Sequence, residues 1–392
     1  MASNMGLPHI AKRMAEIHPF QVMALLARAR ELEAAGKHII HMEIGEPDFV
    51  TPSTILEAGK QSIDQGQTHY TPALGLPALR QAIADFYLQN YGLDISPKRI
   101  AVTCGASGAL LLVMGVLLNP GERVLIADPG YPCNRHFVRF VEGEPVGIPV
   151  DATSVYQLTP DLIERHWNDR TVAALLASPS NPTGTIIPEQ ALTAMFQTVA
   201  SRGGRLIVDE IYHGLTYGQK AASALAISDE VIVINSFSKY FNMTGWRVGW
   251  IVAPEAYVHE IDTLSQNLFL AAPTIAQYAA LAAFHPATRA VLEQRREEFQ
   301  RRRDYLLPAL RDIGFAIPTT PHGAFYLYAD CSRFTQDSYT FTLDLLERAG
   351  VAITPGMDFG FNAPQRHVRF AYTTSLENLK EGVSRIKSFL SQ

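Results

Sequence analysis

The stretch SFSKYFNMTGWRVGW, residues 236–250, follows a short apolar run, VIVIN at 231–235. A run without polar alternation is typical of a strand buried on both faces of a sheet. Directly after it, Lys239 stands between Ser238 and Tyr240. An amine held near other cations and apolar walls loses its proton readily and becomes a nucleophile. The stretch therefore predicts a buried strand that ends in a reactive lysine, although a single lysine at a strand end is more often an ordinary surface residue.

Similar apolar runs recur on both sides of this stretch, and segments with helical periodicity separate them. Strands that alternate with helices pair in parallel and form a sheet covered on both faces. The sequence therefore predicts an α/β fold with a mostly parallel sheet sandwiched by helices. The predicted strands are 100–103, 124–127, 146–150, 172–177, 206–208, 231–235 and 248–252.

The two ends of the chain have a different pattern. The first part predicts a helix at 20–35, a short strand at 39–44 and helices at 53–65 and 76–91. After Pro286 a long charged helix begins, and we interpret the charges of RREEFQRRRD, residues 295–304, as a solvated face. The last hundred residues mix helices with short strands, at 324–329 and 367–372, which is typical of a smaller α+β domain.

Chemically diverse residues follow five of the predicted strands. In an open α/β sheet, ligands bind outside the carboxyl ends of the strands. Packing of a core does not require polar groups at all five ends, so we expect these segments to form one binding crevice. They are CGASGA (104–109), DPGYP (128–132), SPSNPTG (178–184), DEIY (209–212) and SFSK (236–239).

Two of these segments suggest the chemistry of the ligand. The GASG segment, 105–108, begins a helix, so its N–H groups suit a phosphate, although an ordinary helix start explains it as well. Arg247 could complete such a site by a bidentate contact. Asp209 follows three apolar strand residues, where a carboxylate needs a cationic partner. A protonated pyridine nitrogen would serve, and a structural salt bridge is the alternative.

Composition excludes several classes of function. The net charge of -5 gives no drive toward nucleic acid or an anionic membrane. The longest apolar stretch, 109–118, falls short of the roughly 20 residues that span a bilayer, and residues 1–14 lack a signal-peptide core. Cys104, Cys133 and Cys331 form no zinc or C-x-x-C pattern. We expect a cytoplasmic protein without a metal site, whose cysteines are small buried hydrophobes.

Together these motifs resemble the class I/II aminotransferases, which have the pyridoxal-phosphate fold type I of the aspartate aminotransferase superfamily. The resemblance implies a large cofactor-binding domain, 46–285, and a small domain built from both termini, 1–45 and 286–392. The matching pieces, in the family's order, are GEPDF (45–49), YTPALGLPALR (70–80), PGYP (129–132), NPTG (181–184), DEIY (209–212), SFSKYFNMTGWRVGW (236–250) and VRFAY (368–372).

The resemblance also implies a cofactor, pyridoxal 5'-phosphate, and roles for the residues around its ring. Lys239 would hold the cofactor as a Schiff base and then shuttle a proton. Asp209 would pair with the pyridine nitrogen. Tyr212 and Asn181 would hydrogen-bond the phenolic oxygen, and Tyr131 would stack on the ring.

Further residues would bind the phosphate and the substrate. Arg369, Asn181 and the Gly45 backbone would clamp the α-carboxylate of the amino acid. Tyr70 would reach the phosphate of the neighbouring subunit, which would make a homodimer obligatory for activity. The phosphate itself would be held by Gly105, Ala106, Ser107, Ser236, Ser238 and Arg247.

The choice of substrate is less determined. Some related aspartate enzymes place a lysine where this chain has Ser107. Phe20 lies where relatives often place an aromatic wall, although it could equally pack at a helix start. Residues 322–326 lie near the pocket or in a strand core. We expect a neutral or apolar L-amino acid as donor, 2-oxoglutarate or pyruvate as acceptor, and ping-pong kinetics. A C–S β-lyase on the same scaffold is the alternative.

Overall fold

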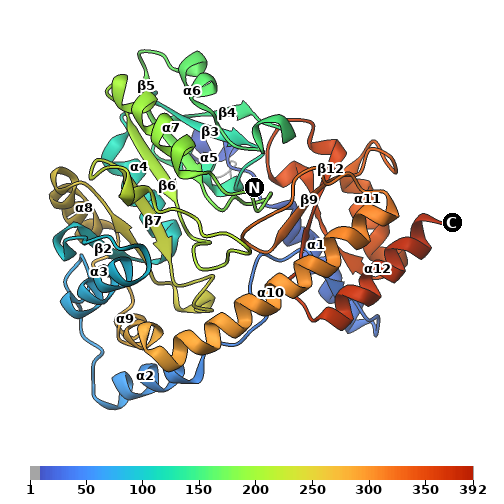
Figure 1. Cartoon of the computed structure of the whole chain (residues 1–392), viewed down its shortest axis with the longest axis horizontal. Helices are drawn as coiled ribbons and strands as arrows, with labels where there is room; N and C mark the ends of the chain where they lie inside the picture. Colours follow the sequence, from blue (N-terminus) through green and yellow to red (C-terminus); the bar gives the residue numbers. More distant parts are fainter. Residues whose placement is uncertain (1–8, 392) are drawn as a thin grey trace, which may run out of the picture.

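Seven strands form the central sheet of the larger part of the molecule, in the order β2-β8-β7-β6-β5-β3-β4 (Figure 1). The computed structural model describes residues 9–391. β8 runs antiparallel to β2 and β7, whereas the pairs formed among β3 to β7 are parallel. The strands are β2 (Ile100–Thr103), β3 (Arg123–Asp128), β4 (Glu144–Pro149), β5 (Thr171–Ala177), β6 (Arg205–Asp209), β7 (Ile232–Ser236) and β8 (Gly249–Val252).

The predicted α/β fold with a mostly parallel sheet is confirmed, and β8 is the exception to the predicted parallel pairing. The connection from β7 to β8 contains only a short 3-10 helix, Thr244–Trp246. A parallel pair needs a crossover of a dozen or more residues, usually a helix, whereas neighbouring antiparallel strands do not. Residues 237–248 contain no α-helix that would carry the chain back along the sheet, so β8 runs in the opposite direction.

Successive side chains of one strand pack into two different cores. On β7, Ile232 and Ile234 belong to one hydrophobic cluster and Val233 to the other, and each is at most 1% exposed. Burial of each such side chain stabilises the fold by roughly 1.5–3 kcal/mol. The first cluster includes residues of α4 (Gly105–Leu117), α5 (Pro132–Phe140) and α8 (Glu255–Leu268), and the second includes residues of α3 (Pro77–Tyr91), α6 (Pro160–His166), α7 (Glu189–Ser201) and α9 (Thr274–Leu281).

The smaller part of the molecule combines both ends of the chain. β11 (Thr354–Pro355), β12 (His367–Ala371) and β9 (Tyr326–Asp330) form an antiparallel sheet. β1 (Ile40–His41), shorter than the predicted strand, pairs in parallel with β10 (Val351–Ala352). The helices of this part are α1 (Gln21–Ala34), α11 (Ser338–Asp344) and α12 (Leu376–Leu390). On these contacts we propose the division into 46–285 and 1–45 with 286–392, of which residues 1–8 and 392 lie outside the described part.

One long helix, α10 (Pro286–Ile313), runs along both parts (Figure 1). Its 28 residues span roughly 42 Å, and it extends from α2 (Ser53–Asp64) to α12. The prediction that the charges of residues 295–304 form a solvated face is wrong in part. Arg302 and Arg303 are only 3% and 8% exposed, because one side of the helix lies against the protein.

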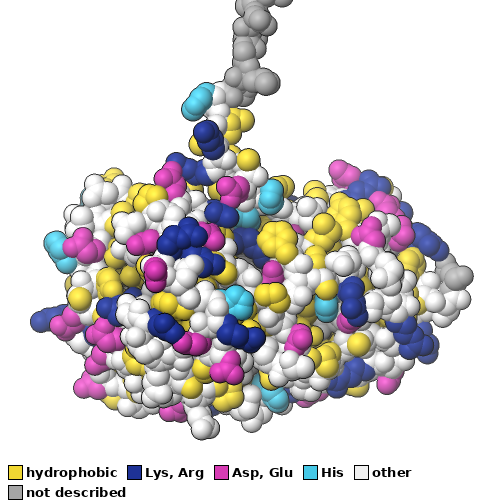
Figure 2. Space-filling view, turned by 90° about the horizontal axis from the view of Figure 1, so that it is seen from above, with side chains coloured by type: hydrophobic (Ala, Val, Ile, Leu, Met, Phe, Trp, Pro, Cys, Tyr) yellow, Lys and Arg dark blue, Asp and Glu magenta, His cyan; other side chains and the backbone are white. Residues whose placement is uncertain are grey.

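The surface carries charges of both signs. On the face drawn in Figure 2, Lys and Arg side chains are interspersed with Asp and Glu. This distribution agrees with the small net charge of -5. Within residues 9–391, none of the helices combines the length and the apolar character needed to cross a membrane.

Candidate active site

A cavity of about 880 Å³ lies at the carboxyl ends of the parallel strands, next to β9 and β12. The structure brings most of the predicted site residues into its wall. Gly105 and Ser236 lie beside lining residues, whereas Tyr70 is outside the cavity and 84% exposed. The predicted residues in the wall are Gly45, Ala106, Ser107, Tyr131, Asn181, Asp209, Tyr212, Ser238, Lys239, Arg247 and Arg369.

Lys239 is the cation at the centre of this arrangement. Its Nζ donates a 2.6 Å hydrogen bond to the carbonyl oxygen of Gly45. Burial lowers the pKa of the amine to about 8, and the positive charges of Arg369 and Arg247 act in the same direction, while Glu46 opposes them. Near neutral pH the amine therefore loses its proton far more easily than a solvated lysine does.

Asp209 ends β6 with its carboxylate buried. The N–H of Ile211 donates a 3.0 Å hydrogen bond to it. Burial raises the pKa of Asp209 to about 6, although that hydrogen bond and the charge of Lys239 favour the ionised form. A buried carboxylate with so little compensation is stabilised by a cation placed beside it. A protonated pyridine nitrogen fits this requirement.

The first turn of α4 forms a cradle for an anion. Gly105 has φ +70°, and a Cβ added there would lie 2.8 Å from Nη2 of Arg247. Gly249 allows β8 to approach closely, since its Cβ would lie 2.9 Å from the carbonyl carbon of Gly105. The Ser236 and Ser238 hydroxyls are hydrogen-bonded to each other at 3.0 Å. Helix N–H groups, hydroxyls and a guanidinium together match a phosphate.

Arg369, on β12, is a buried guanidinium whose donors are only partly paired. Its Nη1 donates to Oδ1 of Asn181 at 2.9 Å, and its Nη2 donates to the Glu43 carbonyl at 2.6 Å. The guanidinium carbon lies 4.2 Å and 4.9 Å from the ring centroids of Tyr326 and Phe359. Its Nε is buried and has no partner in residues 9–391. An unpaired charged donor is costly, and Arg369 lines the cavity, so a carboxylate bound there would supply acceptors for its guanidinium.

Sequence reasoning did not include Tyr326 and Phe359 among the site residues. The hydroxyls of Tyr326 and Tyr212 are hydrogen-bonded at 2.8 Å. A Cβ on Gly45 would lie 2.1 Å from the Tyr326 hydroxyl, so the close approach of Tyr326 to the backbone requires a glycine at this position. Tyr326 belongs to the segment 322–326 that we considered near the pocket, whereas no sequence signal marks Phe359.

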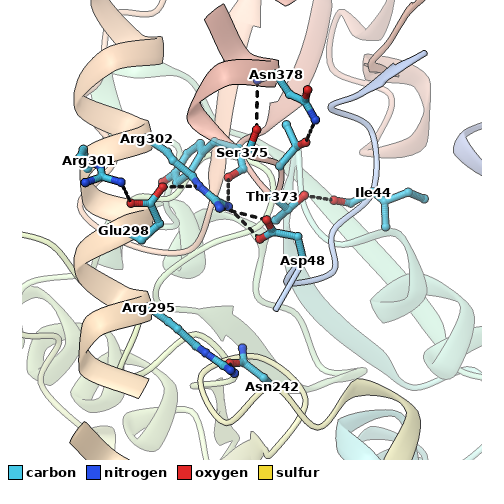
Figure 3. A network of polar contacts seen from close by, with 12 residues as sticks. Ile44, Asp48, Asn242, Arg295, Glu298, Arg301, Arg302, Thr373, Ser375 and Asn378 are labelled. Atoms are coloured by element: carbon cyan, nitrogen blue, oxygen red, sulfur yellow. Dashed lines mark hydrogen bonds and ion pairs between the residues drawn. The ribbon is translucent and has the colours of Figure 1, made fainter. Parts of the chain in front are cut away.

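A network of ion pairs and hydrogen bonds holds the segment that contains Gly45 (Figure 3). Arg302 of α10 binds Asp48 in a bidentate manner, with distances of 2.7 and 3.0 Å, and its Nε donates to Glu298 at 3.0 Å. The hydroxyl of Thr373 donates to the Ile44 carbonyl at 2.9 Å. The network fixes the carbonyl that Lys239 binds.

The cysteines differ in burial from the expectation. Cys331 is buried as predicted, but Cys104 and Cys133 are only half-buried, and all three are free thiols. Cys104 precedes the first turn of α4. The Cys133 thiol donates to the hydroxyl of Tyr131 at 3.1 Å. Cys104 and Cys133 lie beside the cavity wall, because they belong to the segments that follow β2 and β3 and these segments surround the site.

Comparison with known proteins identifies the family. The model of the family aminotransferase class I and II matches residues 37–386. The chain is 38% identical to (5-formylfuran-3-yl)methyl phosphate transaminase of Methanocaldococcus jannaschii, over 98% of this chain and 100% of that protein. It is 35% identical to valine–pyruvate aminotransferase of Mycobacterium tuberculosis, over 96% and 97% of the two chains.

The solved structures agree. Aspartate aminotransferase of Thermus thermophilus with maleate has a TM-score of 0.92 and 34% identity, covering 97% of this chain and 100% of that one. The names of these three relatives give three different substrates, although their sequence identities to this chain are similar. The comparisons therefore establish the type of reaction and not the substrate. The chain belongs to the class I and II aminotransferases, enzymes of fold type I that depend on pyridoxal phosphate.

Proposed function

We propose that the protein transfers the amino group of a neutral or apolar L-amino acid to a 2-oxo acid. The observation that carries this proposal is the apolar wall of the cavity beside α1. Apolar walls favour apolar side chains by about 0.8 kcal/mol for each buried methylene. In the first turn of α4, Ser107 lines the cavity at the position where some related aspartate enzymes place a lysine. The apolar wall consists of Phe20, Val22, Met23, Leu26 and Ile44.

Pyridoxal phosphate fits the donors and acceptors around the cavity. Asp209 would pair with the ring nitrogen, and the first turn of α4 would hold the phosphate. When bound, the cofactor supplies an electron sink that allows the Cα–H bond of an amino acid to break. The remaining contacts that we propose are those of Tyr131 with the ring face, Tyr212 and Asn181 with the phenolic oxygen, Ser236, Ser238 and Arg247 with the phosphate, and Lys239 as the covalent anchor.

The residues of the chain orient the substrate and move its proton. The free edge of Arg369, with Asn181 and the Gly45 backbone, binds the α-carboxylate. The amine of Lys239, whose pKa burial lowers to about 8, accepts the proton from Cα at its Nζ. Phe359 and Tyr326 lie against the guanidinium of Arg369 and exclude water. Both substrates use one cavity in turn, which gives ping-pong kinetics.

We also propose a homodimer in which Tyr70 contributes to the site of the partner. Tyr70 is 84% exposed and lies outside the cavity of its own chain. The hydroxyl of Thr274 donates to the carbonyl of His69 at 2.8 Å, so the Tyr70 segment lies beside the start of α9. Leu268 and Leu270 precede α9 and are 51% and 55% exposed. Sedimentation analysis should give a dimer, and a monomeric active enzyme would contradict the proposal.

The half-reaction tests the function directly. Holoenzyme is mixed with one amino acid at a time, and the absorbance of the cofactor reports its conversion to the aminated form. Alanine, leucine and phenylalanine should react faster than aspartate, and a preference for aspartate would refute the proposed donor class. Pyruvate and ammonia from cystathionine, without an oxo acid, would identify a β-lyase instead. Lys239→Ala should be folded by circular dichroism and inactive.

A further inference from the structure

One cation, Arg30, lies on the otherwise apolar side of the cavity that α1 forms. Val22, Leu26 and Arg30 all line the cavity, and their spacing of four residues places them on one face of the helix. Helical side chains lean toward the N-terminus of their helix. Arg30 is an exposed residue of the cavity wall, and from this tendency we expect its guanidinium to extend over the turn of Leu26, toward the part of the cavity that Val22 and Phe20 line.

The guanidinium of Arg30 has no hydrogen-bond or ion-pair partner in residues 9–391. The acids beside it on α1 are already engaged. Glu31 pairs with Arg28 at 2.9 Å, and Glu33 pairs with His41 at 3.1 Å. The helix thus supplies a cation at the cavity without supplying an anion for it.

The carboxylates of the cavity wall near α1 are engaged as well. Asp358 accepts the backbone N–H groups of Gln21 and Val22, at 2.7 and 2.9 Å, and so fixes the first turn of α1. Glu46 accepts the hydroxyl of Thr244 at 2.5 Å. The described residues therefore leave Arg30 free for an anionic group of a bound molecule.

We propose that Arg30 recognises the second carboxylate of a dicarboxylic substrate, such as 2-oxoglutarate as amino acceptor. This inference rests on the proposed function, because a ping-pong enzyme must accept both of its substrates in one cavity. The planar guanidinium matches a carboxylate by two parallel hydrogen bonds. When a monocarboxylic substrate is bound, its apolar chain lies against Val22 and Leu26, and the long stem of Arg30 lets the charged end turn to water.

Three variants test this role. Arg30→Met keeps the length of the side chain and removes its charge, and Arg30→Lys keeps the charge without the planar fork. Arg28→Met is the control, since Arg28 lies on the same helix and does not line the cavity. With one fixed donor, kcat/KM is measured for 2-oxoglutarate and for pyruvate. Arg30→Met should lower the 2-oxoglutarate to pyruvate ratio 10- to 100-fold, Arg30→Lys should lower it less, and the control should leave it unchanged.

Binding without turnover provides a second measurement. Calorimetry on the holoenzyme compares glutarate, a dicarboxylate that cannot react, with butanoate, which has one carboxylate. Arg30→Met should weaken glutarate at least tenfold and leave butanoate unchanged. Equal effects on the two acids, or an equal loss in Arg28→Met, would overturn the assignment of Arg30. If no amino acid converts the cofactor in the unaltered enzyme, the proposed function fails, while the glutarate comparison still decides the role of Arg30.

Discussion

Removing the ion pair between Asp48 and Arg302 should destabilise the segment that presents Gly45 to Lys239. Arg302 is 3% exposed and binds both oxygens of Asp48, whose side chain is 29% exposed. Breaking a fully buried pair costs about 3–5 kcal/mol. The cost here should be smaller, because Asp48 is partly hydrated and Glu298 still accepts a hydrogen bond from Nε of Arg302 when the Asp48 carboxylate is removed. We therefore expect Asp48→Asn to lower the free energy of unfolding by about 2 kcal/mol.

Urea unfolding of the cofactor-free protein, at one pH and one protein concentration, measures this effect. A double-mutant cycle of Asp48→Asn with Arg302→Met should give a coupling free energy of about 1–2 kcal/mol. Arg301→Met is the matched control. Arg301 pairs with the same Glu298 from the surface, where its side chain is 68% exposed, and its loss should change stability by less than about 0.5 kcal/mol.

The reasoning would be refuted if Asp48→Asn cost no more than the control, or if the cycle gave no coupling. Either result would mean that the segment around Gly45 is held by other contacts, such as the hydrogen bond from Thr373 to Ile44. In the expected case, KM for the amino donor should also rise in Asp48→Asn, because the proposed site for the substrate α-carboxylate includes the Gly45 backbone together with Arg369.

Three further predictions concern the cavity itself. The pKa of Lys239 is about 8 in the folded protein and 10.5 in the free side chain, so the unfolded state binds more protons between these values. The free energy of unfolding should therefore rise with pH from about 8 to 10. Urea unfolding at pH 7.5 and 9.5 should show this rise in the unaltered protein and not in Lys239→Met. Burial raises the pKa of Asp209 to about 6, so above pH 6 the cofactor-free protein contains a buried ionised carboxylate that its surroundings compensate only in part. Asp209→Asn should therefore stabilise the cofactor-free protein by about 1–3 kcal/mol at pH 8 and weaken cofactor binding. Thermal unfolding with and without the cofactor measures both effects, and a cofactor-free variant less stable than the unaltered protein would contradict the prediction. Gly45→Ala should cost about 1–3 kcal/mol, since its Cβ meets the Tyr326 hydroxyl at 2.1 Å; adding Tyr326→Phe should recover part of this loss in the same unfolding assay.

The sequence alone predicted the class of fold because its signals are local. Apolar runs such as residues 231–235 carry no polar alternation, so both faces of each strand must be covered. Their alternation with helices predicts parallel strands, and the carboxyl ends of parallel strands meet at one edge. That is why the segments containing Asn181, Asp209 and Lys239, far apart in the chain, could be expected in one crevice. Their individual roles remain proposals.

Only the tertiary structure decided which distant segments meet around that crevice. The direction of β8 depended on a connection that contains no α-helix, and the burial of Arg302 depended on where α10 contacts Asp48. The position of Tyr326 and Phe359 beside Arg369, and of Arg30 in the cavity wall, results from the packing of both chain ends together. Periodicity reports whether a residue faces a core, but the identity of its neighbours is set by packing across long sequence separations.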